Sequence, residues 1–350
     1  MNLKLLSFVA LGVALASCQP KTSDQQYNVT LDVMEQLNGI TAFMVNFDTG
    51  EKIDSAVIEN GKCEFSGTVA EPLMVRMVAD GNRLGSFVLE GGDITVSDRV
   101  AKGTPLNEEN NKIMEAVNGF NKMYYNTPDG PDGDVLRKQI SDLYDHYSDS
   151  VMLANLDNPV GFTFFLDKAY AMDLAQLNEI LAKHPSLKKY QRVNKLIAAA
   201  ENMEKTSAGK KFADFTVTND SVSQSLSDYV GKGKPVLVDF WASWCGPCIR
   251  ETAVLKQLLA EFGDKGLEVL GVAVWDEPDN TVRAIADHQL PWPQIINAQS
   301  VPTDIYGISA IPCILLIGPD GTILSRGKQG EELIADVTTY FSAPQTSAAE

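Results

Sequence analysis

The stretch VDFWASWCGPCIR, residues 238–250, places two of the chain's five cysteines three residues apart, directly behind an apolar run. Cys245 follows the expected end of a strand and stands where a helix begins, and Pro247 suits the first helical turn. Unpaired backbone amides and the positive end of the helix dipole favour a thiolate at that position. We expect Cys248, one turn further along the helix, to lie beneath the first sulfur and to be less exposed.

Three chemistries fit a cysteine pair at this spacing. A zinc site needs four ligands, usually from two close pairs, and the sequence has no second pair. A permanent disulfide here closes a very short loop and restrains little of the unfolded chain. A reversible redox couple fits best, because an outer thiolate attacks a substrate disulfide and an inner cysteine resolves the mixed disulfide. We therefore expect Cys245 to be the nucleophile, Cys248 the resolving residue, and no metal or other cofactor.

The same stretch resembles the active-site segment of the thioredoxin superfamily, including Trp244 before the first cysteine and Gly246 and Pro247 between the two. About 60 residues later, YGISAIPCILLIGPDG resembles the family segment in which a cis-proline faces the redox pair. By this resemblance Pro312 takes the cis-proline position, with Ile311 before it. The family exposes backbone there, so that an incoming chain pairs as an extra strand.

An aspartate, Asp239, lies inside the apolar run VLVDFWA, where a buried carboxyl costs free energy unless it has a task or a partner. It matches the buried acid of thioredoxins, for which the resemblance implies proton transfer with the inner cysteine. Burial is expected to raise its pKa toward the range of a useful general base. The alternative is an acid that is solvated through a small water channel.

Two further segments, CIRETAVLKQL and the insertion VAVWDEPDNTVRAIADHQLPWPQI, resemble the TlpA/ResA-like membrane-anchored branch of thiol-disulfide oxidoreductases. That branch has an acidic residue near the redox pair at the end of this strand, matched here by Asp276 or Glu277. Ala253 stands where the family usually has a proline, so the helix is expected to lack the usual kink. Cys313 follows the cis-proline position, where threonine is common, and is either buried and inert or able to trap the inner cysteine.

The N-terminus, MNLKLLSFVALGVALASC, has one positive charge followed by an apolar run that ends in small residues, which is typical of a secretory signal. Its end, LASC, resembles a bacterial lipobox, which implies removal of residues 1–17, lipidation of Cys18 and a polar tether over residues 18–26. The alternative is a plain signal peptide with an incidental cysteine. A net charge of −17 argues against nucleic acid as a partner.

The pattern of the remaining chain predicts three parts. Short alternating runs broken by NG, DTG and EGGD predict an antiparallel β domain over residues 27–101. Apolar residues at three- and four-residue spacing predict a helical segment over 104–205. Strands that alternate with helices predict a thioredoxin-like α/β domain over 208–342, with a mixed central sheet flanked by helices, followed by a tail, 343–350. The first two parts loosely resemble envelope proteins of the Bacteroides type, whose N-terminal β domain has no known function.

These features predict an enzyme of the cell envelope, lipid-anchored and facing the periplasm, that reduces disulfides of exported proteins, with cytochrome maturation as one setting. The family implies a DsbD/CcdA-like membrane partner as the electron donor. Two alternatives stay open. One is a disulfide oxidase or isomerase, and the other is a scaffold or binding lipoprotein whose thioredoxin module acts as a redox gate.

Overall fold

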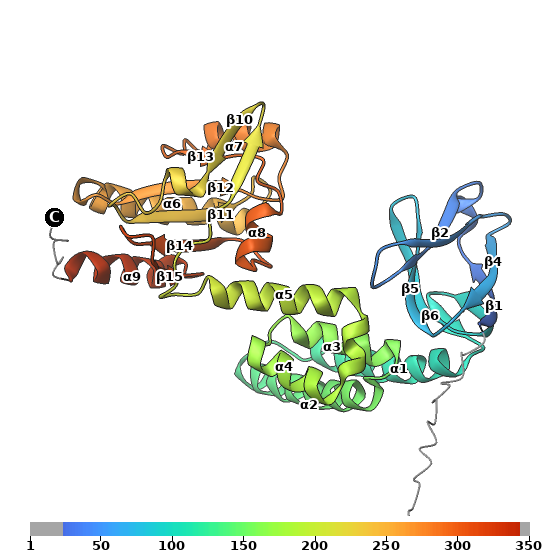
Figure 1. Ribbon diagram of the computed structural model, residues 1–350. Coiled ribbons are helices and arrows are strands. Elements are labelled where there is room, and N and C mark those ends of the chain that lie inside the picture. The colour runs from blue at the N-terminus through green and yellow to red at the C-terminus, as the bar shows by residue number, and fades with distance from the viewer. Residues whose placement is uncertain (1–23, 344–350) are drawn as a thin grey trace, which may run out of the picture. The chain divides into compact units, whose positions relative to one another are not determined.

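The computed structural model describes residues 24–343 (Figure 1). The predicted signal peptide, the lipidation site Cys18 and most of the predicted tail lie outside these residues. Within the described range no helix is both long and apolar enough to cross a bilayer. The chain divides into two compact units between Phe165 and Leu166.

The first unit opens with a β domain, residues 25–102. Its described strands form two four-stranded sheets, in the orders β4-β1-β7-β8 and β3-β2-β5-β6 (Figure 1). Apolar and polar residues alternate along these strands, so the inward faces share one core that includes Val29, Phe65 and Met77. The strands are β1 (Gln25–Asp32), β2 (Thr41–Asn46), β3 (Lys52–Val57), β4 (Lys62–Val69), β5 (Leu73–Ala79), β6 (Asn82–Leu89), β7 (Gly92–Ser97) and β8 (Val100–Lys102).

One strand pairing departs from the antiparallel domain that the sequence predicts. β1 pairs with β4 antiparallel but with β7 parallel, and Val29 lies opposite Ile94 in that parallel pair. Turn signals mark only hairpins, such as the Asp80-Gly81 turn between β5 and β6, where both residues have positive φ. A parallel pair needs a long crossover connection instead, and here the intervening strands supply it.

The helices that follow begin at residues that favour helix starts. The first three begin with a proline, and Asp173 and Gln176 form a reciprocal capping box before the fourth. Residues 174–203 have continuous helical spacing, but Pro185 interrupts the helix because it lacks a backbone N–H, and a short 3-10 turn, Pro185–Lys189, follows. The helices are α1 (Pro105–Tyr125), α2 (Pro131–Asn155), α3 (Pro159–Ala169), α4 (Leu174–Lys183) and α5 (Gln191–Lys205).

The helical stretch 104–205 is shared between the two units, because the division falls inside α3. Its first helix is fastened to the β domain. The carboxylate of Glu90 accepts the backbone N–H of Leu106 at 2.8 Å, and the buried side chain of Asn107 exchanges two hydrogen bonds with the backbone of Val88. The Glu90 bond satisfies a helix-terminal N–H that would otherwise lack a partner, and the Asn107 side chain satisfies the backbone N–H and C=O of Val88 on β6.

The last helix of the stretch is fastened to the C-terminal α/β domain. The guanidinium of Arg326 donates to the backbone oxygen of Thr206 at 3.1 Å and to its hydroxyl at 2.7 Å, and it also reaches the backbone oxygen of Tyr306. Asn202 donates to the backbone oxygen of Asp304 at 2.9 Å. The end of α5 is therefore part of the packing of this domain rather than a free linker.

The α/β domain is built on a sheet of five described strands in the order β13-β12-β11-β14-β15. β11 pairs parallel with β12 and antiparallel with β14, which gives the mixed sheet expected from the sequence. A separate hairpin, β9 and β10, precedes it. The elements are β9 (Thr216–Asn219), β10 (Val222–Ser225), β11 (Val236–Trp241), α6 (Gly246–Phe262), β12 (Glu268–Ala273), α7 (Pro278–Asp287), β13 (Gln294–Ile295), α8 (Val301–Tyr306), β14 (Cys313–Ile317), β15 (Ile323–Arg326) and α9 (Gly330–Ser342).

Both faces of this sheet are covered, so its central strands are buried along their whole length. Leu237 and Trp241 pack on one face against α6 and α9, in the cluster that also contains both redox-motif cysteines. Val238 and Phe240 pack on the opposite face with Tyr306 of α8 and the β9–β10 hairpin. This division decides which side chains can meet the cysteines.

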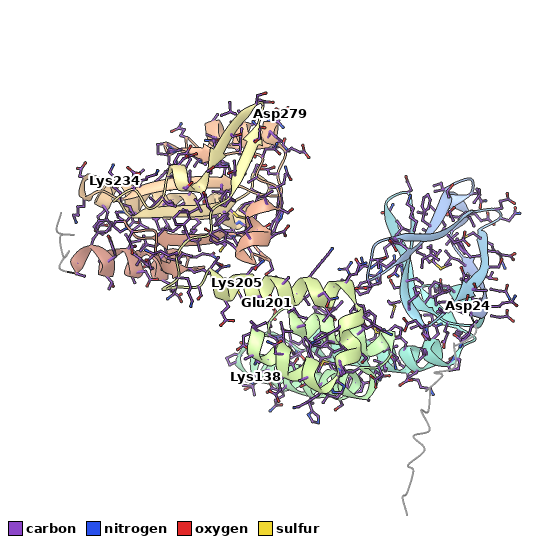
Figure 2. All side chains as sticks on the ribbon, viewed as in Figure 1. Asp24, Lys138, Glu201, Lys205, Lys234 and Asp279 are labelled. Atoms are coloured by element: carbon purple, nitrogen blue, oxygen red, sulfur yellow. A yellow bond between two sulfur atoms is a disulfide. The ribbon has the colours of Figure 1, made fainter. Side chains whose placement is uncertain are left out.

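Ion pairs lie on the surface of both units. Lys205 lies 3.8 Å from Glu201, one turn earlier on α5, and Lys138 lies 2.8 Å from Asp142 on α2 (Figure 2). Exposed pairs of this kind contribute about 0–1 kcal/mol each. Each unit is therefore stabilised mainly by its own buried core rather than by these charges.

Candidate functional site

The two cysteines of the CGPC motif lie at the junction of β11 and α6. Cys245 is the N-cap of α6 and Cys248 is in its first turn, and their sulfur atoms are joined in a disulfide of 2.01 Å. The backbone N–H of Cys248 points at the sulfur of Cys245 over 3.2 Å. The strand ends at Trp241 and the helix begins at Gly246 with Pro247 behind it, so an N–H of the first helical turn, that of Cys248, faces the first sulfur.

The two sulfur-bearing residues differ in exposure. Cys245 keeps 4% of its surface, whereas Cys248 has none. Gly246 and Pro247 beside them are exposed, and Trp244 is 61% exposed while its indole N–H donates to the backbone oxygen of Trp275 at 2.9 Å. Access to the disulfide is therefore from the side of Cys245.

The segment before β14 lies against the outer sulfur. The Ile311–Pro312 peptide bond is cis, and the backbone oxygen of Ile311 lies 3.8 Å from the sulfur of Cys245. The backbone oxygen of Pro312 accepts from the side chain of Gln329 at 3.3 Å. The antiparallel pairing of β14 with β11 thus brings a segment about 60 residues away to the cysteines.

Asp239 lies in the middle of β11 and is 1% exposed. Its neighbours two residues away, Leu237 and Trp241, belong to the cluster around the cysteines, so the carboxyl is on the same face of the sheet as the disulfide. Burial, and then the negative charge of Glu251, raise the pKa of Asp239 to about 8. A carboxyl with that proton affinity can accept a proton near neutral pH.

Glu251 is a second buried acid that the sequence reasoning missed. It is three residues after Cys248 on α6 and 8% exposed, and its carboxylate accepts the backbone N–H of Gly330 at 2.7 Å. Residues three apart share a helix face, so a glutamate at that spacing was the available signal. The contact that holds the carboxylate inside the domain comes from the start of α9. No residue near Glu251 in the sequence indicates that contact.

The structure separates the two acids predicted near the redox pair. Asp276 is 5% exposed, and its carboxylate accepts four hydrogen bonds, two of them from Ser243 in the loop before Cys245. The other two come from the N–H of Glu277 and the hydroxyl of Thr281, each at 2.9 Å. The side chain of Glu277 is exposed and forms no cap bond. Asp276 thus ties the cysteine loop to α7, and Glu277 does not.

Cys313 lies on the opposite face of the sheet from the disulfide. It is paired with Phe240 across β14 and β11, and both belong to the cluster beneath that other face. Burial raises the pKa of the Cys313 thiol to about 11. The free cysteine of the β domain, Cys63, is also buried, and burial raises its pKa to about 11 as well.

The remaining predictions from the sequence concern Ala253, a metal site and Cys18. α6 continues without interruption past Ala253, which is exposed. Across residues 24–343, no group of three metal-ligating side chains is arranged to hold a metal ion. Cys18 lies outside the described residues.

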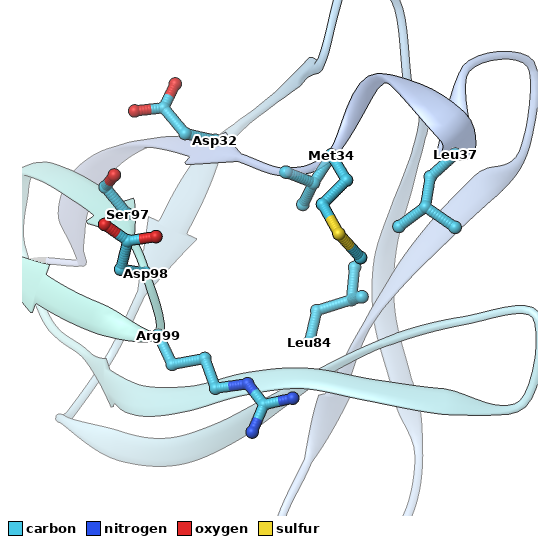
Figure 3. A pocket seen from close by; sticks show the side chains of 8 residues that line it. Asp32, Met34, Leu37, Leu84, Ser97, Asp98 and Arg99 are labelled. Atoms are coloured by element: carbon cyan, nitrogen blue, oxygen red, sulfur yellow. The ribbon is translucent and has the colours of Figure 1, made fainter.

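The β domain has a pocket of its own, with a volume of about 490 Å³. Asp32 and Asp98 lie on one side of it, Met34, Leu37 and Leu84 lie on the other, and Arg99 lies below (Figure 3). Asp98 and Arg99 form the turn between β7 and β8, with φ of 49° and 68°. All of the residues around this pocket belong to the β domain, so it is separate from the site of the cysteines.

A mixed sheet, a disulfide at the start of the first covering helix and a cis-proline beside it together define a thioredoxin-like redox protein. Comparisons with known proteins agree with this class. Residues 208–326 match the model of the AhpC/TSA family, and residues 27–110 match a domain of unknown function, DUF4369. The thioredoxin-like fold and the N-terminal β domain predicted from the sequence are confirmed.

Curated relatives narrow the class. The thiol-disulfide oxidoreductase ResA of Bacillus thuringiensis subsp. konkukian is 30% identical over 137 residues, which cover 38% of this chain and 78% of that protein. ResA of Geobacillus kaustophilus is 34% identical over 124 residues, covering 34% of this chain and 70% of that protein. Among solved structures, the thioredoxin domain of a thiol-disulfide oxidoreductase from Bacteroides vulgatus is 30% identical, with a TM-score of 0.34, covering 38% of this chain and 97% of that one. The chain belongs to the ResA-like family of thiol-disulfide oxidoreductases.

Proposed function

We propose that this chain is a lipid-anchored enzyme of the cell envelope that reduces disulfide bonds of exported proteins through Cys245 and Cys248. The asymmetry of the pair is the observation that supports this most directly. Cys245 has the residual exposure and the helix-terminal N–H of Cys248 at 3.2 Å, whereas Cys248 is completely buried. A helix N-terminus favours a thiolate, so Cys245 is suited to attack and Cys248 to resolve.

The reaction begins from the reduced pair. The Cys245 thiolate attacks one sulfur of the substrate disulfide, which forms an intermolecular disulfide and releases the other substrate sulfur as a thiol after it takes up a proton. Asp239 accepts the proton of Cys248, whose sulfur then attacks that of Cys245. The Cys245–Cys248 disulfide closes, and the second substrate sulfur leaves and takes up a proton. Two electrons have passed from the chain to the substrate.

The substrate has to present its disulfide at the exposed side of the pair. The rim there is formed by Trp244, Gly246 and Pro247 on one side and by the Ile311–Pro312 segment on the other. Backbone beside the cis-proline can pair with an extended substrate segment, while the flat indole of Trp244 offers apolar contact. We infer that the substrates are exported proteins with an accessible disulfide, cytochrome apoproteins among them.

Sequence features support the proposed direction of electron flow and the proposed location. The Gly-Pro dipeptide between the cysteines matches reducing thioredoxins, with potentials of about −270 mV, rather than DsbA at about −120 mV. The signal-like N-terminus and Cys18 support a lipid anchor on the periplasmic side. A reductant in an oxidising compartment must itself be reduced, so we propose a DsbD/CcdA-like membrane protein as the donor.

The reduction potential of the Cys245–Cys248 couple tests this proposal. It is measured on the soluble chain from residue 19 onward by equilibration with glutathione or dithiothreitol mixtures, and a double variant, Cys245→Ser with Cys248→Ser, serves as the blank. A value near or below about −250 mV supports the reductase. A value near −150 mV overturns the reducing direction in favour of oxidation or isomerisation. A chain with no reversible two-electron couple would instead be a scaffold or binding protein.

A further inference from the structure

Two buried polar atoms on the cysteine-bearing face of the sheet have no hydrogen-bond partner among the described residues. They are Oδ1 of Asp239 and Nε2 of Gln294. One is an acceptor in a carboxyl group and the other a donor in a carboxamide. Because buried polar groups are nearly always paired, two complementary orphans on one face need an explanation.

The strand register places these two side chains in one row across the sheet. Asp239 on β11 is paired with Gly271 on β12, and Gly271 is paired with Gln294 on β13. Both pairings are parallel, so the three residues share a face of the sheet. Only Gly271, which has no side chain, lies between the carboxyl and the carboxamide.

The carboxamide of Gln294 occupies the space that a side chain at position 271 would fill. A Cβ atom added to Gly271 would lie 1.9 Å from Oε1 and 2.7 Å from Nε2 of Gln294. Neighbouring strands are about 4.8 Å apart. An amide group above Gly271 is therefore about one strand spacing from the residue beside it, Asp239.

Trp241 sets the orientation of this carboxamide. Its indole N–H, which can only donate, lies 3.0 Å from Oε1 of Gln294. The reversed amide would place two donors against each other, so the oxygen must face the indole. The NH₂ group is thereby left free to donate elsewhere over Gly271.

We propose that Gln294 is a positioning residue for Asp239: its carboxamide, held by Trp241, donates a hydrogen bond to the ionised Asp239 carboxylate, directly or through one water molecule. The bond forms as Asp239 loses its proton, which stabilises the charged form of a carboxyl that has no other partner for Oδ1. The catalytic meaning of this inference rests on the proposed function, in which Asp239 accepts the proton of Cys248. The bond itself is independent of catalysis.

The other charged or titratable groups around Asp239 act in different directions. Glu251 on α6 is negative and disfavours ionisation of Asp239. Cys248 on α6 is in the disulfide and does not titrate in this form. On β14, Cys313 interacts with both Asp239 and the Arg326 guanidinium of β15, but it faces the other side of the sheet. Gln294 is thus a neutral donor that offsets the acidic neighbour.

The test follows the protonation of Asp239 in the oxidised chain by the infrared band of its protonated carboxyl as pH is raised. The band that is lost in Asp239→Asn is assigned to Asp239. Any carboxyl band that is lost in Glu251→Gln instead belongs to the second buried acid. Wild type is expected to titrate near pH 8. Gln294→Met, similar in length but without a donor, should move the midpoint upward by about one pH unit, the size expected for a lost bond to a charged group.

Two further variants separate positioning from a structural effect. Gln294→Glu keeps an oxygen for the indole of Trp241 but offers no donor when it is ionised. The midpoint of the Asp239 titration in this variant should therefore rise at least as far as in Gln294→Met. Gln224→Met removes another half-buried amide, which bonds Tyr229 at 2.7 Å and the backbone of Gln294 at 3.4 Å, and should leave the midpoint unchanged.

A Gln294→Met midpoint equal to that of wild type would overturn the proposal, whatever the activity of the protein. A second outcome is a raised midpoint in Gln294→Met together with an unchanged rate of disulfide reduction in Asp239→Asn. Gln294 would then position Asp239, as proposed, while the proton-accepting role in the proposed function would be wrong.

Discussion

Ser243 is held to Asp276 by two hydrogen bonds, one from its backbone N–H at 2.7 Å and one from its hydroxyl at 2.9 Å. Ser243 is in the loop before Cys245, and Asp276 immediately precedes the N-cap of α7. An acid that resemblance placed near the redox pair therefore supports the loop that carries the pair. Its four donors leave the carboxylate well satisfied despite its burial.

Replacing Asp276 with alanine is expected to lower the free energy of unfolding of the α/β domain by about 3 kcal/mol, because several buried donors lose a charged acceptor. Urea unfolding followed by tryptophan fluorescence measures this, since all four tryptophans lie in that domain. Glu277→Ala is the matched control and should change the value by less than about 0.5 kcal/mol. Equal effects of the two substitutions would contradict the assignment.

Asp239→Asn is expected to stabilise the oxidised protein increasingly as pH rises. The folded-state pKa of Asp239, about 8, lies above its unfolded value of 3.8. The folded wild-type protein therefore loses stability as pH rises from about 4 to about 8, and this loss is complete above pH 8. At pH 9 the gain should approach about 6 kcal/mol, because the two pKa values lie about four units apart and each unit corresponds to about 1.4 kcal/mol; urea unfolding at a series of pH values measures it. Asp320→Asn is the control, because hydrogen bonds from Lys211 and Thr322 keep the pKa of Asp320 low. A gain that does not depend on pH would show that Asp239 is not a buried neutral acid.

Glu251→Gln is expected to shift the pH profile of disulfide reduction toward acid. The substitution removes the negative charge that raises the pKa of Asp239, while an amide oxygen can still accept the N–H of Gly330. The rising limb should move down by up to about one pH unit, measured with insulin as substrate. Glu261→Gln, on the exposed side of the same helix, should leave the profile in place. A shift toward alkali would contradict the repulsion between the two acids.

Thiol labelling distinguishes the cysteines of the soluble chain. The native oxidised protein should react slowly with an aromatic disulfide reagent, and two thiols, those of the buried Cys63 and Cys313, should become reactive on unfolding in urea.

Cys313→Ala should retain the rate of disulfide reduction within about twofold, because the sheet separates this thiol from the Cys245–Cys248 pair. A trapped Cys248–Cys313 disulfide, detected by peptide mapping, would contradict this placement.

A fragment that retains α5 should be more stable than one that begins after it. We expect residues 190–343 to exceed residues 208–343 by about 2 kcal/mol in free energy of unfolding, because the shorter fragment loses the bonds to Arg326 and Asp304 together with the packing of α5 on α8. Urea unfolding of both fragments measures the difference. Arg326→Met in the longer fragment should remove part of it, and equal stabilities of the two fragments would show that α5 is only a linker.

The sequence was most informative where a signal is local. The apolar run before Cys245, the proline in the first turn of α6 and the glycine-containing turns each act within a few residues. They therefore predicted the strand before Cys245, the helix that begins there and the hairpins of the β domain. The same signals did not reveal that Pro185 divides the stretch 174–203, because apolar spacing continues on both sides of it.

Side-chain placement across the sheet was beyond such signals. β14 is buried on both faces, so its apolar run has no alternation to show that Cys313 points away from the disulfide. Nothing near Asp276 or Glu277 in the chain shows which of them meets Ser243. Glu251 is buried where its carboxylate accepts the N–H of Gly330, a residue far along the chain.

By itself the sequence determined the class of chemistry, because a CGPC pair at a helix start and a proline before a buried strand are patterns of adjacent residues. Only the tertiary structure decided which groups surround that chemistry. The row Asp239, Gly271 and Gln294 comes from three strands, and the parallel pairing of β1 with β7 joins residues 65 positions apart. Such relationships depend on strand register and on the packing of covering helices, which are set by contacts between distant residues rather than by the order of neighbours along the chain.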